Sequence, residues 1–336
     1  MRRTFIALSL SLSLSLSLSL LAGTVLAQTA PAAGAASAWP SKPLRILVGF
    51  PGGSSPDLTA RTLAEPLSKA LGQPVIVENR VGAAGNIAAD LLAKATDEHT
   101  LGLLINGNMT IAKLLNPALP YDPLKDLAPV SLIGTAPLVL AAPAELSGAN
   151  AREFFANARS NGNKWSYGTP GVGTVAHIGM ELLKSNSGID PVHVPYPGNP
   201  QVVNAMLGGQ IQLALLPPGL ALPQVRAGKL KAVGITSSGR SALVPDVASL
   251  DEQGVTRGFQ LEVWNGVAAP ATMPAAHLAR LSSVISEIVR SPEVRQKLVQ
   301  QGWDVAGTNA EGLANRIKVD TAQLGGVISS RGIKVE

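Results

Sequence analysis

Cysteine is absent from the 336-residue chain, and histidine occurs only four times. Without cysteine the chain forms no disulfide, performs no thiol chemistry and binds no metal through thiolates. The histidines are too far apart along the sequence to suggest a metal site: His99, His177, His193 and His277. We therefore expect neither a metal nor any other cofactor.

Blocks of positive charge are also missing. The chain has 27 Lys and Arg residues against 22 Asp and Glu residues, and removing residues 1–27 takes away two arginines, so that 25 against 22 leaves a net charge of +3. This small, dispersed excess does not indicate nucleic-acid binding. It is compatible with a small anionic ligand.

Three common functional motifs are not found. There is no GxxxxGK[ST] phosphate loop, Gly52-Gly53 lacks the third glycine of GxGxxG, and the GxSxG of a nucleophile elbow is absent. No Ser, His and acid order stands out either. We therefore predict a protein that is not an enzyme, and keep as a weaker alternative a hydrolase that uses a serine of the Gly52–Ser55 loop.

The N-terminus has the pattern of an export signal. Arg2-Arg3 is basic, residues 5–26 form an uncharged Leu/Ser run, and Val25-Leu26-Ala27 is a small-residue cleavage pattern. We predict a signal peptide over residues 1–27 and a linker over residues 28–38, rich in Ala, Pro and Gly. An uncleaved membrane anchor is the alternative, because the apolar run is longer than usual. No other stretch is long and apolar enough to span a membrane.

The stretch after the linker predicts a strand, a glycine turn and a helix. Leu44–Phe50 is an apolar run, Pro51–Ser55 contains two glycines, and Ser55-Pro56-Asp57 is typical of a helix start with Ser55 as the N-cap. Such a unit points unpaired backbone N–H groups and the positive helix end at one place, where an anion can bind. A tight strand-to-helix connection without a ligand is the alternative.

The same rhythm continues along the chain. A strand over 75–78, a helix over 87–95 and a strand over 101–105 follow, and the last ends in Asn106-Gly107-Asn108. Alternating strands and helices predict a parallel sheet, in which ligands bind at the carboxyl ends of the strands. We therefore expect Asn106 and Asn108 to line a cleft, although such residues are also common in turns.

A second unit with the same rhythm predicts two domains. The apolar run over 131–142 should cross into the second domain, where Thr174 is a good N-cap after the loop Gly168–Thr174, and the run over 262–269 should cross back. We expect an α/β fold of two domains, each with a mainly parallel sheet flanked by helices, that closes around a ligand. The predicted boundaries are 39–135 and 263–336 for the first domain and 136–262 for the second.

Several separated motifs, in the same order, resemble the tripartite tricarboxylate transporter receptors, the Bug or TctC family of periplasmic solute-binding proteins. The resemblance runs from about residue 39 to the C-terminus. The residues that carry it are Val77-Glu78-Asn79-Arg80 with Gly82, Gly85 and Asn86; Tyr121-Asp122-Pro123; Gly171-Val172-Gly173-Thr174 with His177; His193-Val194-Pro195-Tyr196; Gly208-Gly209-Gln210; Ala227-Gly228-Lys229-Leu230; and Trp264 with Gly266.

The resemblance implies a monomeric Venus-flytrap receptor in the periplasm that hands a small organic carboxylate to a membrane permease. Its loops 51–57 and 171–174 would hold the carboxylate through backbone amides and hydroxyls, and Asp57 would read a polar group of the ligand. A receptor that reports to a membrane sensor kinase is the alternative. The predicted ligand-binding residues are Gly52, Gly53, Ser54, Ser55, Asp57, Asn106, Asn108, Gly171, Val172, Gly173, Thr174 and His177.

The sequence departs from the family pattern at three places that matter for these expectations. Pro56 is inserted before Asp57, which leaves the number of binding amides open, and the turn Asp97–Thr100 is shorter than usual. Leu215-Leu216-Pro217 stands where the family often has acidic or amide residues. If that segment lines the cleft, it favours a mono- or dicarboxylate with an apolar body over citrate or an amino acid; the alternative is that it lies behind the cleft. His177 is expected either to pack and cap its helix or to contact the ligand.

Overall fold

The computed structural model describes residues 39–148 and 150–331. The described residues from Lys42 onward form one compact unit, and every element below lies in it. The predicted signal peptide and linker, residues 1–27 and 28–38, lie outside the described residues. Among the described residues, no helix combines the length and the apolar character needed to cross a membrane.

Six strands form the first sheet, in the order β11-β4-β10-β3-β1-β2. β1, β2 and β3 are parallel, whereas β10 runs antiparallel to both β3 and β4, and β11 antiparallel to β4. The strands are β1 (Leu44–Val48), β2 (Val75–Asn79), β3 (Thr100–Ile105), β4 (Leu127–Pro137), β10 (Glu262–Pro270) and β11 (Asp304–Val305).

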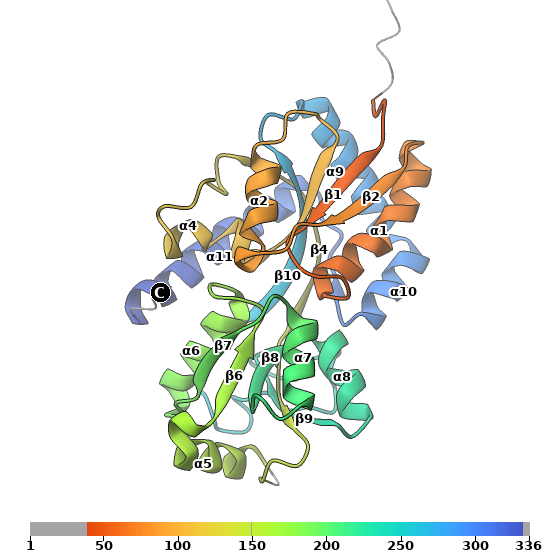
Figure 1. The fold of residues 1–336 in the computed structure, drawn as a ribbon. Helices are drawn as coiled ribbons and strands as arrows, with labels where there is room; N and C mark the ends of the chain where they lie inside the picture. The colour runs from red at the N-terminus through yellow and green to blue at the C-terminus, as the bar shows by residue number, and fades with distance from the viewer. Residues whose placement is uncertain (1–38, 149, 332–336) are drawn as a thin grey trace, which may run out of the picture. The chain divides into compact units, whose positions relative to one another are not determined.

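Helices cover both faces of this sheet, as Figure 1 shows. α2 and α11 share an apolar cluster with Leu104, Trp264 and Ala268 on one face, while α1, α9 and α10 contact one another on the other. With this sheet they form what we call the first lobe. The helical segments are α1 (Ser55–Leu71), η1 (Ala83–Gly85), α2 (Asn86–Ala93), α3 (Asn106–Met109), α4 (Ala112–Leu115), α9 (Ala275–Arg290), α10 (Pro292–Gln300) and α11 (Ala310–Arg331).

The second lobe is built on a five-stranded sheet, in the order β7-β6-β8-β5-β9. β6 is parallel to β7 and β8, and β5 is antiparallel to β8 and β9. The elements are β5 (Val139–Pro143), α5 (Ala151–Asn161), η2 (Gly162–Lys164), β6 (Ser166–Thr169), α6 (Val175–Ser187), β7 (Val192–Pro195), α7 (Asn199–Leu207), β8 (Leu213–Leu216), α8 (Pro218–Arg226) and β9 (Leu230–Ile235).

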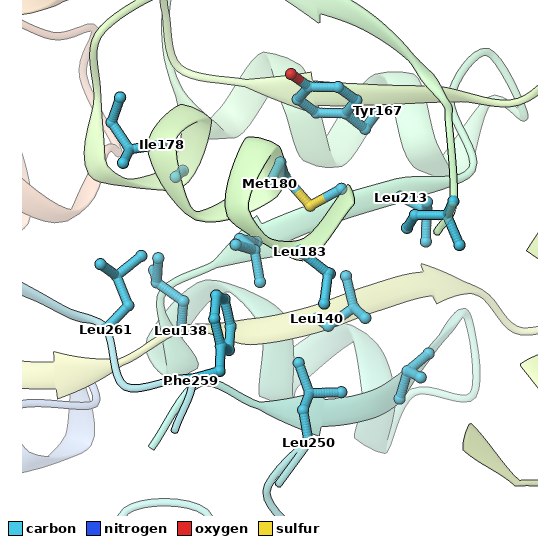
Figure 2. Close-up of a cluster of buried hydrophobic side chains, with 14 of the residues drawn as sticks. Leu138, Leu140, Tyr167, Ile178, Met180, Leu183, Leu213, Leu250, Phe259 and Leu261 are labelled. Atoms are coloured by element: carbon cyan, nitrogen blue, oxygen red, sulfur yellow. The ribbon is translucent and has the colours of Figure 1, made fainter. Parts of the chain in front are cut away.

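Alternation along β5 gives the second lobe two cores, because successive side chains of a strand point to opposite faces. Leu138 and Leu140 belong to the cluster under α5 and α6, and Val139 and Ala141 to the cluster under α7 and α8. Figure 2 shows the first cluster, in which Met180 and Leu183 of α6 lie over β5. The second lobe also receives Leu324 and Ile328 from α11 in this cluster.

Two chain crossings join the lobes where the apolar runs predict them. β4 and β5 are separated only by Leu138, so that one extended segment serves both sheets, and β10 returns to the first sheet. The sheets are mixed rather than mainly parallel, because the crossing strands enter each of them antiparallel to their neighbours. Strand direction here follows from long-range pairing, which local strand and helix rhythm does not report.

The start of α1 differs from the predicted one by a residue. Ser54, with φ −71° and ψ 158°, is the N-cap, and Pro56 occupies the second helical position. At the other end Gly72 adopts a left-handed conformation and donates its N–H to the carbonyl oxygen of Ser68, which ends the helix. Thr174 is confirmed as the N-cap of α6, because its side chain accepts the N–H of His177.

Candidate functional site

Two loops, one in each lobe, have nearly the same backbone. A glycine has φ near +80° in both, +80° at Gly53 and +82° at Gly173, and the next residue is the N-cap of a long helix. The caps, Ser54 and Thr174, have φ and ψ values within a few degrees of each other. We call residues 51–54 the first loop and residues 171–174 the second loop.

The glycine N–H of the first loop is held by a carboxylate one turn into the helix. Gly53 donates its N–H to Oδ2 of Asp57 at 2.9 Å, and the same carboxylate receives bonds from Arg61 and from Asn79 at 2.8 Å. Burial alone would raise the pKa of Asp57, but these hydrogen bonds and the Arg61 charge outweigh it and hold the pKa below its usual value. Asp57 is therefore ionised, and its carboxylate holds the loop in place.

The corresponding N–H of the second loop is held by an imidazole. Gly173 donates its N–H to Nδ1 of His177 at 3.3 Å, which requires that nitrogen to be unprotonated. The His177 ring stacks on His193 with 4.5 Å between centroids, and His193 stacks on Tyr167. Burial lowers the pKa of both histidines, that of His193 to about 4, so the neutral form that the loop needs is favoured.

Both helix starts reach one small cavity between the lobes, which we call the inner cavity. Its volume is about 40 Å³, space for about three water molecules. Of the described residues that line it, none is charged. Its polar wall consists of Ser54, Ser55, Asn106, Thr174, Asn199 and Asn265, and its apolar wall includes Phe50, Ile105, Leu138, Leu215, Pro217 and Val263.

Four polar side chains of this wall keep an oxygen without a hydrogen-bond partner, although each is at least nine-tenths buried. The oxygens are Oγ of Ser54 and Oδ1 of Asn106, Asn199 and Asn265. Thr174 differs, because its hydroxyl donates to Gly171 O at 2.8 Å and accepts the N–H of His177. Buried unpaired polar atoms cost free energy, so their convergence on one cavity indicates a bound ligand.

A larger cavity of about 600 Å³, which we call the outer cavity, adjoins the inner one. Ile105 and Pro170 line both, so the two cavities are neighbours at these residues. Ala83 and Ala84 form part of its wall with φ values of 47° and 53°, a strained conformation for alanine. The outer wall also contains Asn108, Gly171, Val172, Gly173, Pro195, Tyr196 and Pro197.

The lobes touch each other where glycine leaves out a side chain. A Cβ on Gly198 would lie 2.7 Å from Pro51 of the first loop, and one on Gly171 would lie 2.9 Å from Ala84. Similarly, a Cβ on Gly107 would lie 3.2 Å from the carbonyl oxygen of Gly173. Close approach of the lobes around the cavities therefore depends on these glycines.

The structure places the predicted site residues in three groups. Ser54, Ser55, Asn106 and Thr174 line the inner cavity, and Asn108, Gly171, Val172 and Gly173 line the outer one. Asp57 and His177 hold the loop amides and line neither cavity, and neither do Gly52 and Gly53. Of the segment Leu215-Leu216-Pro217, the first and last residues line the inner cavity, whereas Leu216 packs in the core below α7 and α8.

Sequence reasoning missed two polar residues of the inner cavity. Asn199 begins α7 after Gly198, so it occupies a third glycine-to-helix junction that the sequence shows plainly. Asn265 lies in β10 among buried apolar residues and is 1% exposed. A lone amide inside an otherwise apolar strand is the signal that identifies it, because buried polar groups require partners.

Two mixed α/β lobes around a shared cavity are the architecture of a periplasmic binding protein, and solved structures agree. A periplasmic transporter, 33% identical, covers 89% of this chain with a TM-score of 0.84, and all of that chain is matched. A Rhodopseudomonas palustris structure titled with adipate is 26% identical (88% and 99% of the chains, TM-score 0.84), and MatC of that species with bound malate is 31% identical (86% and 99%, TM-score 0.81).

The chain belongs to the tripartite tricarboxylate transporter family of receptors, TctC, whose model matches residues 59–333. A Pseudomonas sp. protein from the tcbD-tcbE intergenic region is 33% identical over 90% of both chains. BugT of Bordetella pertussis is 32% identical over 90% of this chain and 93% of its own. The resemblance and the two-lobed α/β fold are thus confirmed. Members of this family are binding proteins and not enzymes, which removes the hydrolase alternative.

Proposed function

We propose that this protein captures a small organic carboxylate with the carboxylate group in the inner cavity and the remainder of the ligand in the outer one. The observation that carries the proposal is the meeting of two helix N-termini and the unpaired Ser54 hydroxyl at one buried place. Unpaired N–H groups and the helix dipoles favour a negative charge there.

The donors on the two sides are unequal. α6 offers the backbone N–H groups of Val175 and Ala176, because that of His177 is used by the Thr174 cap. α1 has Pro56 at its second position, and proline has no N–H, so this helix contributes the Ser55 amide and the Ser54 hydroxyl. The inserted proline thus removes one amide, and the serine hydroxyl takes the place of a lost donor.

The size and lining of the cavities favour a carboxylate over a larger anion. The inner volume of about 40 Å³ suits one carboxylate with an adjacent polar atom. No charged side chain lines either cavity among the described residues, so a second or third charge would have no opposite charge beside it. Leu215 and Pro217 at the inner cavity further favour a ligand with an apolar body.

The family assignment supports the remaining parts of the proposal. We propose export by cleavage after residue 27, domains over 39–135 with 263–336 and over 136–262 that close on the ligand, and delivery to a tripartite tricarboxylate-type permease. Two related structures carry malate and adipate, which are both carboxylates. We assign ligand binding to the residues predicted from the sequence, with Asp57 and His177 positioning the two loops.

Thermal unfolding with a panel of acids tests the carboxylate assignment. Purified protein is mixed with aliphatic and aromatic mono- and dicarboxylates of three to eight carbons, each paired with the corresponding neutral amide as a control. A bound ligand raises the melting temperature by mass action, so we expect at least one acid to raise it while its amide does not. Equal shifts for acids and amides, or none for any acid, would contradict the proposal.

A further inference from the structure

Two of the unpaired oxygens in the inner cavity are hydrogen-bond acceptors whose orientation is fixed by the rest of the side chain. Asn106 donates Nδ2 to the backbone carbonyl of Glu262 at 3.0 Å, and a carbonyl can only accept. The amide therefore cannot be turned around without losing that bond. Its Oδ1 is left unpaired at the inner cavity on a residue that is 0% exposed.

Asn265 is fixed in the same sense through a short hydrogen-bond chain. Thr59 donates its hydroxyl hydrogen to Ser55 O at 2.9 Å, so its oxygen can only accept from Nδ2 of Asn265, at 3.1 Å. The same oxygen also accepts the indole N–H of Trp303. Oδ1 of Asn265 thus remains an acceptor without a donor, and Asn265 pairs in the sheet with Ile105, the residue before Asn106.

A bound carboxylate cannot satisfy these oxygens, because a carboxylate is itself only a hydrogen-bond acceptor. Left unpaired, each buried oxygen carries the full desolvation cost of its group. A ligand that brings a hydrogen-bond donor next to its carboxylate removes this cost. The arrangement therefore selects for a second polar group on the ligand, within the same small volume.

The charge of that donor is restricted by the surroundings. Of the described residues lining the inner cavity none is an acid, so a ligand ammonium would be buried without an opposite charge from the protein. Asp57, which follows the first loop in α1, does not line the cavity, and its carboxylate already accepts hydrogen bonds from Gly53, Arg61 and Asn79. A neutral O–H donor meets the acceptors without that cost.

We propose that the ligand is a 2-hydroxy acid, whose carboxylate faces the two helix N-termini and whose hydroxyl donates to Asn106 or Asn265. The inference rests on the carboxylate function proposed above and narrows its substrate class. The volume of about 40 Å³ accommodates the carboxylate with the adjacent hydroxyl, and the carbon chain continues past Ile105 and Pro170 into the outer cavity.

Two ligand series that differ only at the carbon beside the carboxylate test the proposal by calorimetry. Succinate, malate and aspartate carry H, OH and NH₃⁺ at that carbon, and 3-phenylpropanoate, 3-phenyllactate and phenylalanine repeat the comparison with an apolar body. In the series that fits the outer cavity, we expect the hydroxy acid to bind at least tenfold more tightly than both partners. Equal affinity of the hydrogen and hydroxyl members would overturn the inference, since water would then be satisfying the oxygens, and so would a preference for the ammonium member.

A pair of variants assigns the preference to the cavity oxygens. Asn265→Leu keeps a similar volume but has no acceptor, and should reduce the preference for the hydroxy acid over the plain acid, measured as the ratio of their dissociation constants, to about threefold or less. Asn204→Leu, on an exposed position of α7, is the matched control and should keep the full preference. Preserved preference in Asn265→Leu and in Asn106→Leu would contradict the assignment.

The same titrations separate this inference from the function on which it rests. Binding of plain acids as tight as that of hydroxy acids refutes the 2-hydroxy preference and leaves the carboxylate function standing. Failure of every acid in both series and in the thermal panel refutes the carboxylate function, and the inference falls with it.

Discussion

The first and second loops have the same backbone, a glycine near φ +80° followed by an N-cap, yet their side chains are used differently. The Thr174 hydroxyl donates to Gly171 O in its own loop and accepts the N–H of His177 in its own helix. Ser54 makes no capping bond, and its hydroxyl oxygen at the inner cavity has no hydrogen-bond partner. The glycine N–H is held by a carboxylate, Asp57, in one loop and by an imidazole, His177, in the other.

The hydroxyl of the second loop's cap has its hydrogen bonds without a ligand, whereas that of the first loop's cap does not. Capping residues are normally read as contributors to helix stability. Ser54 shows that a residue at the cap position can instead be left unsatisfied, at a cost in the empty protein that a ligand removes on binding. In the proposed site, the Thr174 hydroxyl therefore serves structure, whereas the Ser54 hydroxyl serves recognition.

The largest expected effect comes from adding a methyl group to each loop. Gly171→Ala introduces a Cβ 2.9 Å from Ala84 of the other lobe at a φ of +125°, while a Cβ on Gly53 is 4.0 Å from Pro200. Both variants strain the backbone, by about 1–2 kcal/mol, but only Gly171→Ala should also hold the lobes apart. We expect at least a 30-fold loss of affinity for Gly171→Ala in calorimetry and less than a fivefold loss for Gly53→Ala.

A strain-free variant separates lobe contact from loop strain. Gly198 has φ −176°, which any residue adopts, and its Cβ would lie 2.7 Å from Pro51. Gly198→Ala should therefore weaken binding with little change in unfolding free energy, whereas Gly239→Ala, with nothing within 4 Å, should change neither. Full affinity in both Gly171→Ala and Gly198→Ala would show that the lobes need not touch.

The two caps should respond to alanine in opposite ways. Ser54→Ala removes a donor to a charged group, so affinity should fall by about 1.5–3 kcal/mol, while the free energy of unfolding without ligand stays the same or rises. Thr174→Ala removes a true cap and should lower the unfolding free energy by about 1 kcal/mol. Denaturant titration and calorimetry on both variants measure the four values. A stability loss in Ser54→Ala as large as in Thr174→Ala would remove the distinction.

The smallest effect is a difference in how stability depends on pH between the two side chains that hold the loop glycines, His177 and Asp57. The pKa of His177 lies below 6.5 in the folded protein because of burial, and that of His193 is lowered to about 4 by burial and by the His177 charge, with Glu181 and Lys184 nearby. As pH falls from 6.5 toward 4, the unfolded chain binds protons that the native state excludes, so stability decreases. The pKa of Asp57 is lowered, so its contribution to stability is present above the usual Asp pKa and is lost only as the pH falls below about 5.

Denaturant unfolding between pH 7.5 and 5 measures this slope. His177→Gln retains an acceptor for the Gly173 N–H but does not titrate. It should therefore reduce the loss of unfolding free energy as the pH falls, and adding His193→Gln should reduce that loss further. Slopes are compared rather than absolute stabilities, because each change also alters the ring stack. An unchanged slope in the double variant would mean that other groups take up the protons.

Much of the fold could be predicted because local signals mark it strongly. The Thr174 cap and the two apolar crossings depend on residues close in sequence. Strand direction could not, since β10 finds β3 and β4 across more than a hundred residues. The one-residue error at α1 arose because two consecutive serines precede Pro56, and both satisfy the usual preferences for a cap.

The candidate site could be predicted as two loops but not as a cavity. Glycine-to-helix junctions indicated Ser54 and Thr174, and the end of a strand indicated Asn106; all three line the inner cavity. Which of two hydroxyls is already bonded depends on contacts such as that between Thr174 and Gly171 O, which residue type does not reveal. Asn265 enters the site because β10 is the strand next to β3, a pairing known only once the sheet is assembled.

The absence of charged side chains from the inner cavity has a consequence for the medium in which the protein works. A binding site built from lysine or arginine at the surface weakens as dissolved salt screens the attraction, whereas buried dipoles are screened much less. In the proposed site the anion would meet helix ends and a serine hydroxyl at residues such as Ser54, which is 1% exposed. Ligand capture should therefore vary little with ionic strength.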